Sequence, residues 1–215
     1  MSFLTKISKL LLRSPLLWGT GLAFCFFSLI QRGVISNGYV VRYLAGHWVE
    51  YIEVGLFCVG LSSLAMKLLS TVRQRNSLSR CALPAVMSGG QHPSEAISLR
   101  TYLLENVNGE QGYLPKRLGD GLDFVTRTGK ADDLEDHLKY LADVDGARAH
   151  ASYGLVRFIV WAIPIMGFLG TVIGITVAIA NLSPTELENI SGVVAGLGTA
   201  FDTTATALAL SMVLM

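Results

Sequence analysis

The chain has 215 residues, of which 51% are hydrophobic and 15% charged, and its formal net charge at pH 7 is +1. Its mean hydropathy is +0.48, and values this apolar indicate a polytopic membrane protein rather than a soluble domain. The cysteines exclude a disulfide framework, because Cys25 and Cys58 fall in apolar segments and Cys81 falls on the expected cytoplasmic side. The sequence also has no metal-binding spacing, so we expect no resident cofactor.

Four apolar segments approach or exceed the length of about 20 residues that a helix needs to cross a bilayer. They cover residues 15–30, 49–69, 155–180 and 192–215. The first is the shortest. We therefore expect an all-α protein with four transmembrane helices, organised in three parts. These parts are an N-terminal hairpin over 1–70, a helical cytoplasmic insertion over 71–150 and a C-terminal hairpin over 151–215.

The basic residues in the short flanks predict the orientation of these helices, because lysine and arginine are enriched on the cytoplasmic side. They gather before the first span and after the second, whereas the loop after the third span contains Glu186 and Glu188 and no basic residue. Arg32 and Arg42 in the first outer loop oppose this bias but are outnumbered. We expect both termini and residues 70–150 to face the cytoplasm. The basic residues on which this rests are Lys6, Lys9, Arg13, Lys67, Arg73, Arg75 and Arg80.

Each end of the chain admits a second interpretation. The basic start followed by an apolar run also resembles a secretory signal peptide, but no A-x-A-like cleavage site follows Ile30, so we expect the first segment to stay as an anchor. The last segment ends on S-M-V-L-M without the charged or aromatic flank that natural spans usually have. We therefore expect the C-terminal hairpin to be truncated, or to have a tail beyond residue 215.

The polar stretch between the second and third spans is punctuated like a set of helices. No proline occurs between its last helix and Pro164, so we expect this helix to continue into the third span, with Gly146 and Gly154 as weak points. Such a helix would couple cytoplasmic packing to the membrane. The expected helices cover about residues 93–104, 115–127 and from 131 onward.

The third span carries a stripe of small residues. At about 100° per residue these fall on one side of the helix, while large side chains such as Phe168 and Ile173 cover the rest. Because lipid gives helices little hydrophobic drive to associate, such a stripe marks a face packed on another helix. Pro164 lies just before it and is either a simple kink or a hinge. The stripe consists of Gly167, Gly170, Thr171, Gly174 and Ala178.

The fourth span carries a second small stripe, which is rich in threonine. The two stripes either pack on each other with nothing passing between them or line an ion path, and periodicity alone leaves both alternatives open. Asp202 favours the second, because a carboxylate near the centre of a span costs about 3 kcal/mol and usually serves an ion, a proton or a partner. It could equally be structural, protonated and hydrogen-bonded to a threonine. The second stripe consists of Gly192, Ala195, Gly196, Thr199, Ala200, Thr203, Thr206 and Ala207.

These last two spans contain two recognisable motifs, P-I-M-G-F-L-G-T-V-I-G at residues 164–174 and A-F-D-T-T-A-T-A-L at residues 200–208. Both resemble motifs of the MotA/TolQ/ExbB proton-channel family. The resemblance implies that Thr171 and Thr204 face a pore and that Pro164 matches the proline of the flagellar-stator members. It also implies that five subunits surround the single transmembrane helices of two MotB/ExbD/TolR-like partner chains, which supply the titrating aspartate.

The chain departs from the family pattern at three positions. Ala207 stands where the fourth-span motif commonly has glycine, and Thr199 stands where import-system relatives carry a glutamate. Asp202 is not part of the expected pattern, so the family implies no role for it. Four spans with an inward N-terminus resemble flagellar stators and the stator-like subunits of anti-phage systems, and the driven process stays open.

We therefore expect a proton-conducting stator subunit of the bacterial inner membrane, which works as a homopentamer with its single-span partner and converts ion motive force into mechanical work. The ion is expected to be H⁺ rather than Na⁺, because sodium coordination needs several oxygens. A secondary transporter and a non-conducting membrane scaffold stay open as alternatives. We expect neither an enzyme nor a nucleic-acid partner. The expected ion path comprises Thr171, Asp202, Thr203 and Thr204, and the packing and hinge residues are Pro164, Gly167, Gly170, Gly174 and Gly196.

Overall fold

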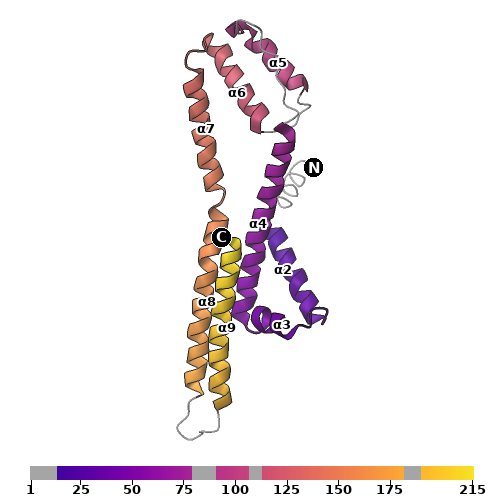
Figure 1. The fold of residues 1–215 in the computed structure, drawn as a ribbon, viewed down its shortest axis with the longest axis vertical. Coiled ribbons are helices and arrows are strands. Elements are labelled where there is room, and N and C mark those ends of the chain that lie inside the picture. The colour runs from indigo at the N-terminus through magenta and orange to yellow at the C-terminus, as the bar shows by residue number, and fades with distance from the viewer. Residues whose placement is uncertain (1–13, 79–90, 107–112, 182–189) are drawn as a thin grey trace, which may run out of the picture. The chain divides into compact units, whose positions relative to one another are not determined.

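The computed structural model describes residues 14–78, 91–106, 113–181 and 190–215, and within these ranges every regular element is a helix (Figure 1). The all-α expectation is confirmed for this part of the chain. Lys6, Lys9, Arg13, Arg80, Cys81, Glu186 and Glu188 lie outside the described residues. The helices are α2 (Pro15–Gln31), α3 (Gly38–Ala45), α4 (Trp48–Leu78), η1 (Pro93–Glu95), α5 (Ala96–Asn106), α6 (Tyr113–Thr128), α7 (Leu134–Ala151), α8 (Gly154–Ala180) and α9 (Ile190–Leu214).

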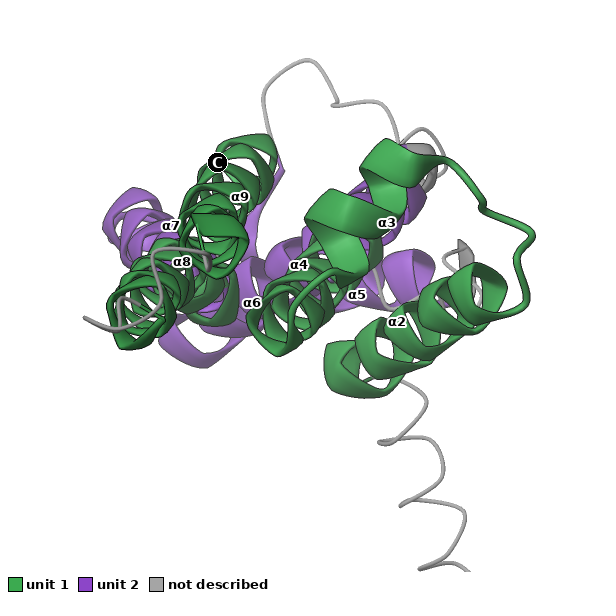
Figure 2. Cartoon of the chain, turned by 90° about the horizontal axis from the view of Figure 1, so that it is seen from below, with its two compact units in different colours: residues 1–66, 153–215 green, residues 67–152 purple. Residues whose placement is uncertain are grey.

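The chain divides into two compact units (Figure 2). Unit 1 combines Met1–Met66 with Tyr153–Met215, and unit 2 is the intervening stretch Lys67–Ser152. Unit 1 thus joins the first and last of the three parts expected from the sequence. The three-part division into domains stays a prediction.

Three segments are long and apolar enough to cross a membrane, judged by length and composition: Trp48–Arg75, Leu134–Ala180 and Ile190–Leu214. The helix α2 is also apolar, but with 17 residues it falls below the length of the other three. A membrane protein with three candidate spans is therefore supported, and the first of the four expected spans, which corresponds to α2, stays a prediction. Helix α2 begins with Pro15 at the first helical position, where the missing N–H of proline costs no hydrogen bond.

The helix that we expected to continue from residue 131 into the third span is interrupted. Helix α7 ends at Ala151 and α8 begins at Gly154, so Ser152 and Tyr153 separate them. The hydroxyl of Ser152 donates to the carbonyl oxygen of Ala149 at 2.6 Å, and such local bonds compete with regular helix hydrogen bonding. Of the two glycines expected as weak points, Gly154 begins the new helix and Gly146 lies inside α7.

The core of unit 1 lies where α4, α8 and α9 meet. Val59, Ile159, Ile163, Ala207 and Leu214 form its main buried cluster. Helix α2 joins through a second cluster that it shares with α4, and it approaches closely, because a Cβ atom on Gly19 would lie 2.4 Å from the Cα of Val59. Glycine is needed at this position for α2 to reach α4.

Unit 2 is held by contacts from α6 to its two neighbours. Arg117 of α6 pairs with Asp145 of α7, and Asp123 of α6 pairs with Arg100 of α5 at 2.6 Å. The ring of His137 stacks on Phe124 at 4.3 Å between centroids, which gives this histidine a packing role. Among the described residues, no group of three or more His, Cys, Asp or Glu side chains could hold a metal ion.

Candidate functional site

The interface between α8 and α9 is built from the two small-residue stripes. A Cβ atom on Gly167 would lie 2.4 Å from the Cβ of Ala207, and one on Gly174 would lie 2.7 Å from the backbone nitrogen of Ala200. Real Cβ atoms do not approach so closely, so the two backbones are in contact because side chains are missing. The two stripes therefore pack on each other along these glycines within one subunit, which is the first of the two alternatives that the sequence left open. Gly170 and Gly196 make equally close approaches, to Thr203 and to Ala178.

At one edge of this interface, the hydroxyls of Thr171 and Thr204 hydrogen-bond to each other. The Thr171 hydroxyl also lies within hydrogen-bond distance of the carbonyl oxygens of Gly167, at 3.2 Å, and Ala200, at 3.1 Å. The Thr204 hydroxyl lies 3.1 Å from each of the same two oxygens. Both threonines are half-buried. The four oxygens form a compact polar cluster, which we call the threonine pair site.

The chemistry of this site follows from its donor count. Each hydroxyl has one proton to donate and two lone pairs to accept with, and a carbonyl oxygen only accepts. The hydroxyls of Thr171 and Thr204 therefore cannot satisfy all their short contacts as donors at once, and oxygen lone pairs remain for a further donor. Such a cluster can accept from a water or a hydrated proton, or contribute ligands to a small cation, without holding a fixed charge.

Thr203 lies next to this site but faces a different environment. It is completely buried against Gly170, and its hydroxyl donates within its own helix, to the carbonyl oxygens of Thr199 at 2.9 Å and Ala200 at 3.2 Å. Within the subunit this places Thr203 in the packing between α8 and α9. Pro164 lies inside α8 and leaves its helical assignment unbroken, so the choice between kink and hinge stays open.

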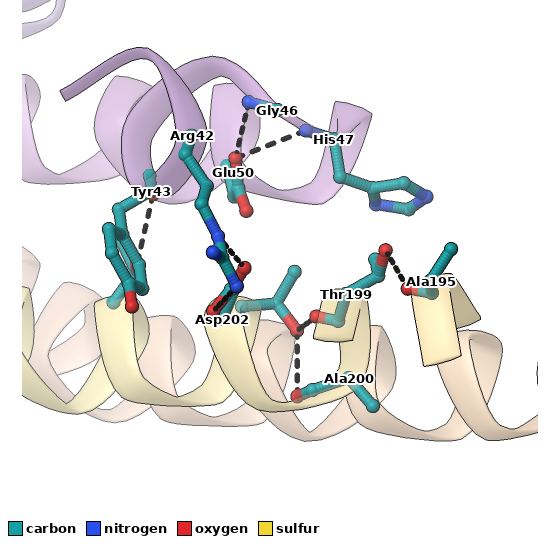
Figure 3. A network of polar contacts seen from close by, with 11 residues as sticks. Arg42, Tyr43, Gly46, His47, Glu50, Ala195, Thr199, Ala200 and Asp202 are labelled. Atoms are coloured by element: carbon teal, nitrogen blue, oxygen red, sulfur yellow. Dashed lines mark hydrogen bonds and ion pairs between the residues drawn. The ribbon is translucent and has the colours of Figure 1, made fainter. Parts of the chain in front are cut away.

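Asp202 lies on another side of α9. Two residues along a helix correspond to a turn of about 200°, so the side chains of Asp202 and Thr204 point about 160° apart. Asp202 accepts two hydrogen bonds from Arg42 of α3, at 2.7 Å from Nε and 3.2 Å from Nη2 (Figure 3). This carboxylate also raises the pKa of the Arg42 guanidinium above its ordinary value. The structure thus separates Asp202 from the threonine pair site and gives it an arginine partner in place of the threonine that we considered.

Sequence reasoning missed two carboxylates at the start of α4. Glu50 and Glu53 are 1% and 0% exposed. One oxygen of Glu50 accepts from the backbone N–H groups of Gly46, at 2.6 Å, and His47, at 3.1 Å (Figure 3). Neither oxygen of Glu53 has a hydrogen-bond partner among the described residues. The signal was present in the sequence, because two glutamates three positions apart inside an apolar span are rare without a function or a partner.

Fold and site together define a helical membrane protein whose last two helices pack through glycine and present a pair of threonine hydroxyls. Residues 112–215 match the model of the MotA/TolQ/ExbB proton channel family. The matched stretch runs from the residue before α6 to the end of α9 and includes Thr171 and Thr204. No curated protein and no solved structure matches the chain.

Proposed function

We propose that this protein is a proton-conducting stator subunit, in which the threonine pair site lines the ion path. The observation that carries the proposal is the meeting of the Thr171 and Thr204 hydroxyls with the carbonyl oxygens of Gly167 and Ala200, inside the stretch that matches a proton channel family. Hydroxyl and carbonyl oxygens can pass a proton or a hydrated ion along without trapping charge. The site is half-buried within one subunit, which leaves it accessible from one side.

The complete pore is proposed to require several copies of the chain. A single α8–α9 pair cannot enclose a path, and large apolar side chains on both helices, including Phe168 and Phe201, are exposed in the isolated subunit. Contiguous exposed apolar surface in a spanning region faces lipid or further helices. A homopentamer in the bacterial inner membrane would cover part of this surface and place five threonine pairs around a central axis. The single-span partner would occupy that axis and supply a titrating aspartate.

Protons are the proposed ion, and sodium is the alternative that the geometry keeps open. The threonine pair site offers two hydroxyl and two carbonyl oxygens from one subunit, and oxygen ligands are what sodium needs. The sequence supplies no nucleophile with an adjacent base, so we propose no catalytic activity. Helices α8 and α9 run unbroken for 27 and 25 residues, which favours a channel over a secondary transporter with discontinuous spans.

The subunit composition of the complex tests this proposal. The full chain is expressed together with the products of its neighbouring genes, purified in mild detergent and analysed by native mass spectrometry. We expect five copies of this chain with two copies of a single-span protein. A monomer or dimer that never acquires such a partner would favour a transporter or a scaffold, and the threonines would then be packing residues.

A further inference from the structure

Helix α9 is held from two nearly opposite sides. On one side Thr204 meets Thr171 of α8, and on the other Asp202 meets Arg42 of α3. One turn after Asp202, the hydroxyl of Thr206 donates to the carbonyl oxygen of Tyr43 at 2.9 Å. Helix α3 therefore makes two directional polar contacts with the side of α9 that is turned away from the threonine pair site.

Helix α3 is itself fixed to α4, so it can act as a strut, that is, a rigid connection that holds α9 in a fixed position relative to α4. Directly after its last residue, the backbone N–H groups of Gly46 and His47 donate to the buried carboxylate of Glu50 (Figure 3). At its start, the side chain of Asn37 accepts from the backbone N–H of Tyr39 at 3.1 Å and caps the helix. The strut thus runs from Glu50 on α4, through α3, to Asp202 on α9.

The position of Thr204 depends on how α9 is rotated about its own axis. A rotation of about 30° moves a Cα atom, at a radius of about 2.3 Å, by about 1.2 Å. That is enough to break the 3.1 Å contact from the Thr204 hydroxyl to the carbonyl oxygen of Gly167. Around the threonine pair site the α8–α9 interface consists of glycine, alanine and threonine, which interlock little, so directional contacts on other sides of α9 help to fix its rotation.

Building on the proposed function, we propose that Arg42 and Asp202 form a positioning pair, which sets the rotation of α9 and thereby holds the Thr204 hydroxyl at the ion path. Neither residue touches the ion. The bidentate geometry suits this role, because two parallel hydrogen bonds fix an orientation as well as a distance. Pairing with Arg42 also offsets the cost of a carboxylate inside a span, which explains why Asp202 is tolerated there.

The first test measures the rotation of α9 without using ion flux. A Thr171→Cys and Thr204→Cys double variant is made in a chain with Cys25→Ala, Cys58→Ala and Cys81→Ala, and the assembled complex is oxidised mildly in membranes. A disulfide forms only when the two Cβ atoms are about 4 Å apart. The rate of cross-linking therefore reports how α9 is rotated relative to α8. Adding Asp202→Asn or Arg42→Gln is expected to slow cross-linking about fivefold or more. The charge swap, Arg42→Asp with Asp202→Arg, should restore the rate to within about twofold.

Two further variants serve as a graded substitution and a control for this test. Arg42→Lys retains the charge and loses the bidentate bond, so it should assemble normally and cross-link at an intermediate rate. Arg32→Gln changes an exposed arginine at the end of α2 and should have no effect. Cross-linking at the unsubstituted rate in Asp202→Asn, Arg42→Gln and Arg42→Lys would overturn the positioning role.

Ion flux then links the rotation to function. In vesicles with native threonines, Asp202→Asn and Arg42→Gln are expected to lower proton flux about tenfold at equal amounts of complex, and the charge swap to recover it. If cross-linking responds as expected but the unsubstituted complex carries no flux, the pair still sets the rotation of α9 and the proposed conduction fails. If flux falls and cross-linking does not change, the positioning role is contradicted.

Discussion

The hydroxyls of Thr171 on α8 and Thr204 on α9 meet across the glycine-lined interface of these helices, although the two residues are 33 positions apart. Both also reach the carbonyl oxygens of Gly167 and Ala200. The relationship depends on the absence of side chains nearby, because only a close backbone approach lets two short hydroxyls touch. The close approach of the two backbones therefore explains both the packing of α8 on α9 and the contact between the two hydroxyls.

The close approach of α8 and α9 predicts that Gly174→Ala destabilises the protein. The new Cβ would meet the backbone nitrogen of Ala200 and the backbone oxygen of Gly196, both at 2.7 Å, and backbone atoms cannot move aside. Overpacking of this kind costs about 1–3 kcal/mol. Gly198→Ala is the matched control, because nothing lies within 4 Å of a Cβ there. Thermal unfolding in detergent compares the two variants, and equal melting temperatures would contradict the close packing of α8 on α9.

The contact between α2 and α4 gives a second matched pair. Gly19→Ala places a Cβ 2.4 Å from the Cα of Val59, whereas Gly21→Ala meets nothing within 4 Å. We expect Gly19→Ala to loosen α2, and we expect limited proteolysis of the variant to cut the N-terminal segment faster. Gly21→Ala should be cut at the unsubstituted rate. Faster cleavage in both variants, or in neither, would argue against this packing.

The buried carboxyl of Glu53 predicts a gain in stability when it is removed. Glu53→Leu replaces a buried polar group that has no hydrogen-bond partner in the described part of the chain, and such groups cost about 1–3 kcal/mol. Glu50→Leu should instead lose about 1 kcal/mol, because Glu50 accepts from two backbone N–H groups before α4. Chemical unfolding of both variants in detergent checks the contrast. A loss of stability in Glu53→Leu would mean that this carboxyl has a partner in the assembled protein.

The sequence predicted part of this arrangement well. Glycine spacing in the third span and threonine spacing in the fourth identified the two faces that pack, and the family motif identified Thr171 and Thr204. Short-range periodicity carries this information, because each stripe is a property of one helix. Which of two neighbouring threonines faces the partner helix depends on details of packing, and Thr203 was for that reason placed in the ion path although it is buried against Gly170.

The contacts of Asp202 could not be predicted in the same way. Its partner Arg42 is 160 positions away, on a short helix within a stretch that we expected to be an outer loop. No periodicity links residues so far apart, and the pairing becomes visible only when α3 is placed beside α9. Glu53 is different, because two glutamates inside one apolar span are a signal that the sequence itself contains.

The Arg117–Asp145 pair in unit 2 predicts a pH dependence of stability. Its hydrogen bond and charge lower the pKa of the Asp145 carboxyl below the ordinary value of 3.8. A carboxyl with a lowered pKa in the folded state contributes stability above its unfolded pKa, and that contribution is lost as the pH falls through the folded value. We therefore expect the difference in unfolding midpoint between the unsubstituted chain and Asp145→Asn to be constant near neutral pH and to shrink below pH 3.8. A difference that persists unchanged in strong acid would contradict the pairing.

A measurement of proton flux tests whether the threonine pair site lies on the ion path. Complexes with Thr171→Val or Thr204→Val are reconstituted in vesicles at equal amounts, and a pH-sensitive dye reports flux under an imposed gradient. Valine keeps the shape and removes the hydroxyl, so both variants should conduct about tenfold less than the unsubstituted complex. Thr176→Val is the control, since among the described residues its exposed hydroxyl bonds within α8, to the carbonyl oxygen of Val172 at 2.8 Å. Unchanged flux in both Thr171→Val and Thr204→Val would show that the threonine pair site does not lie on the ion path.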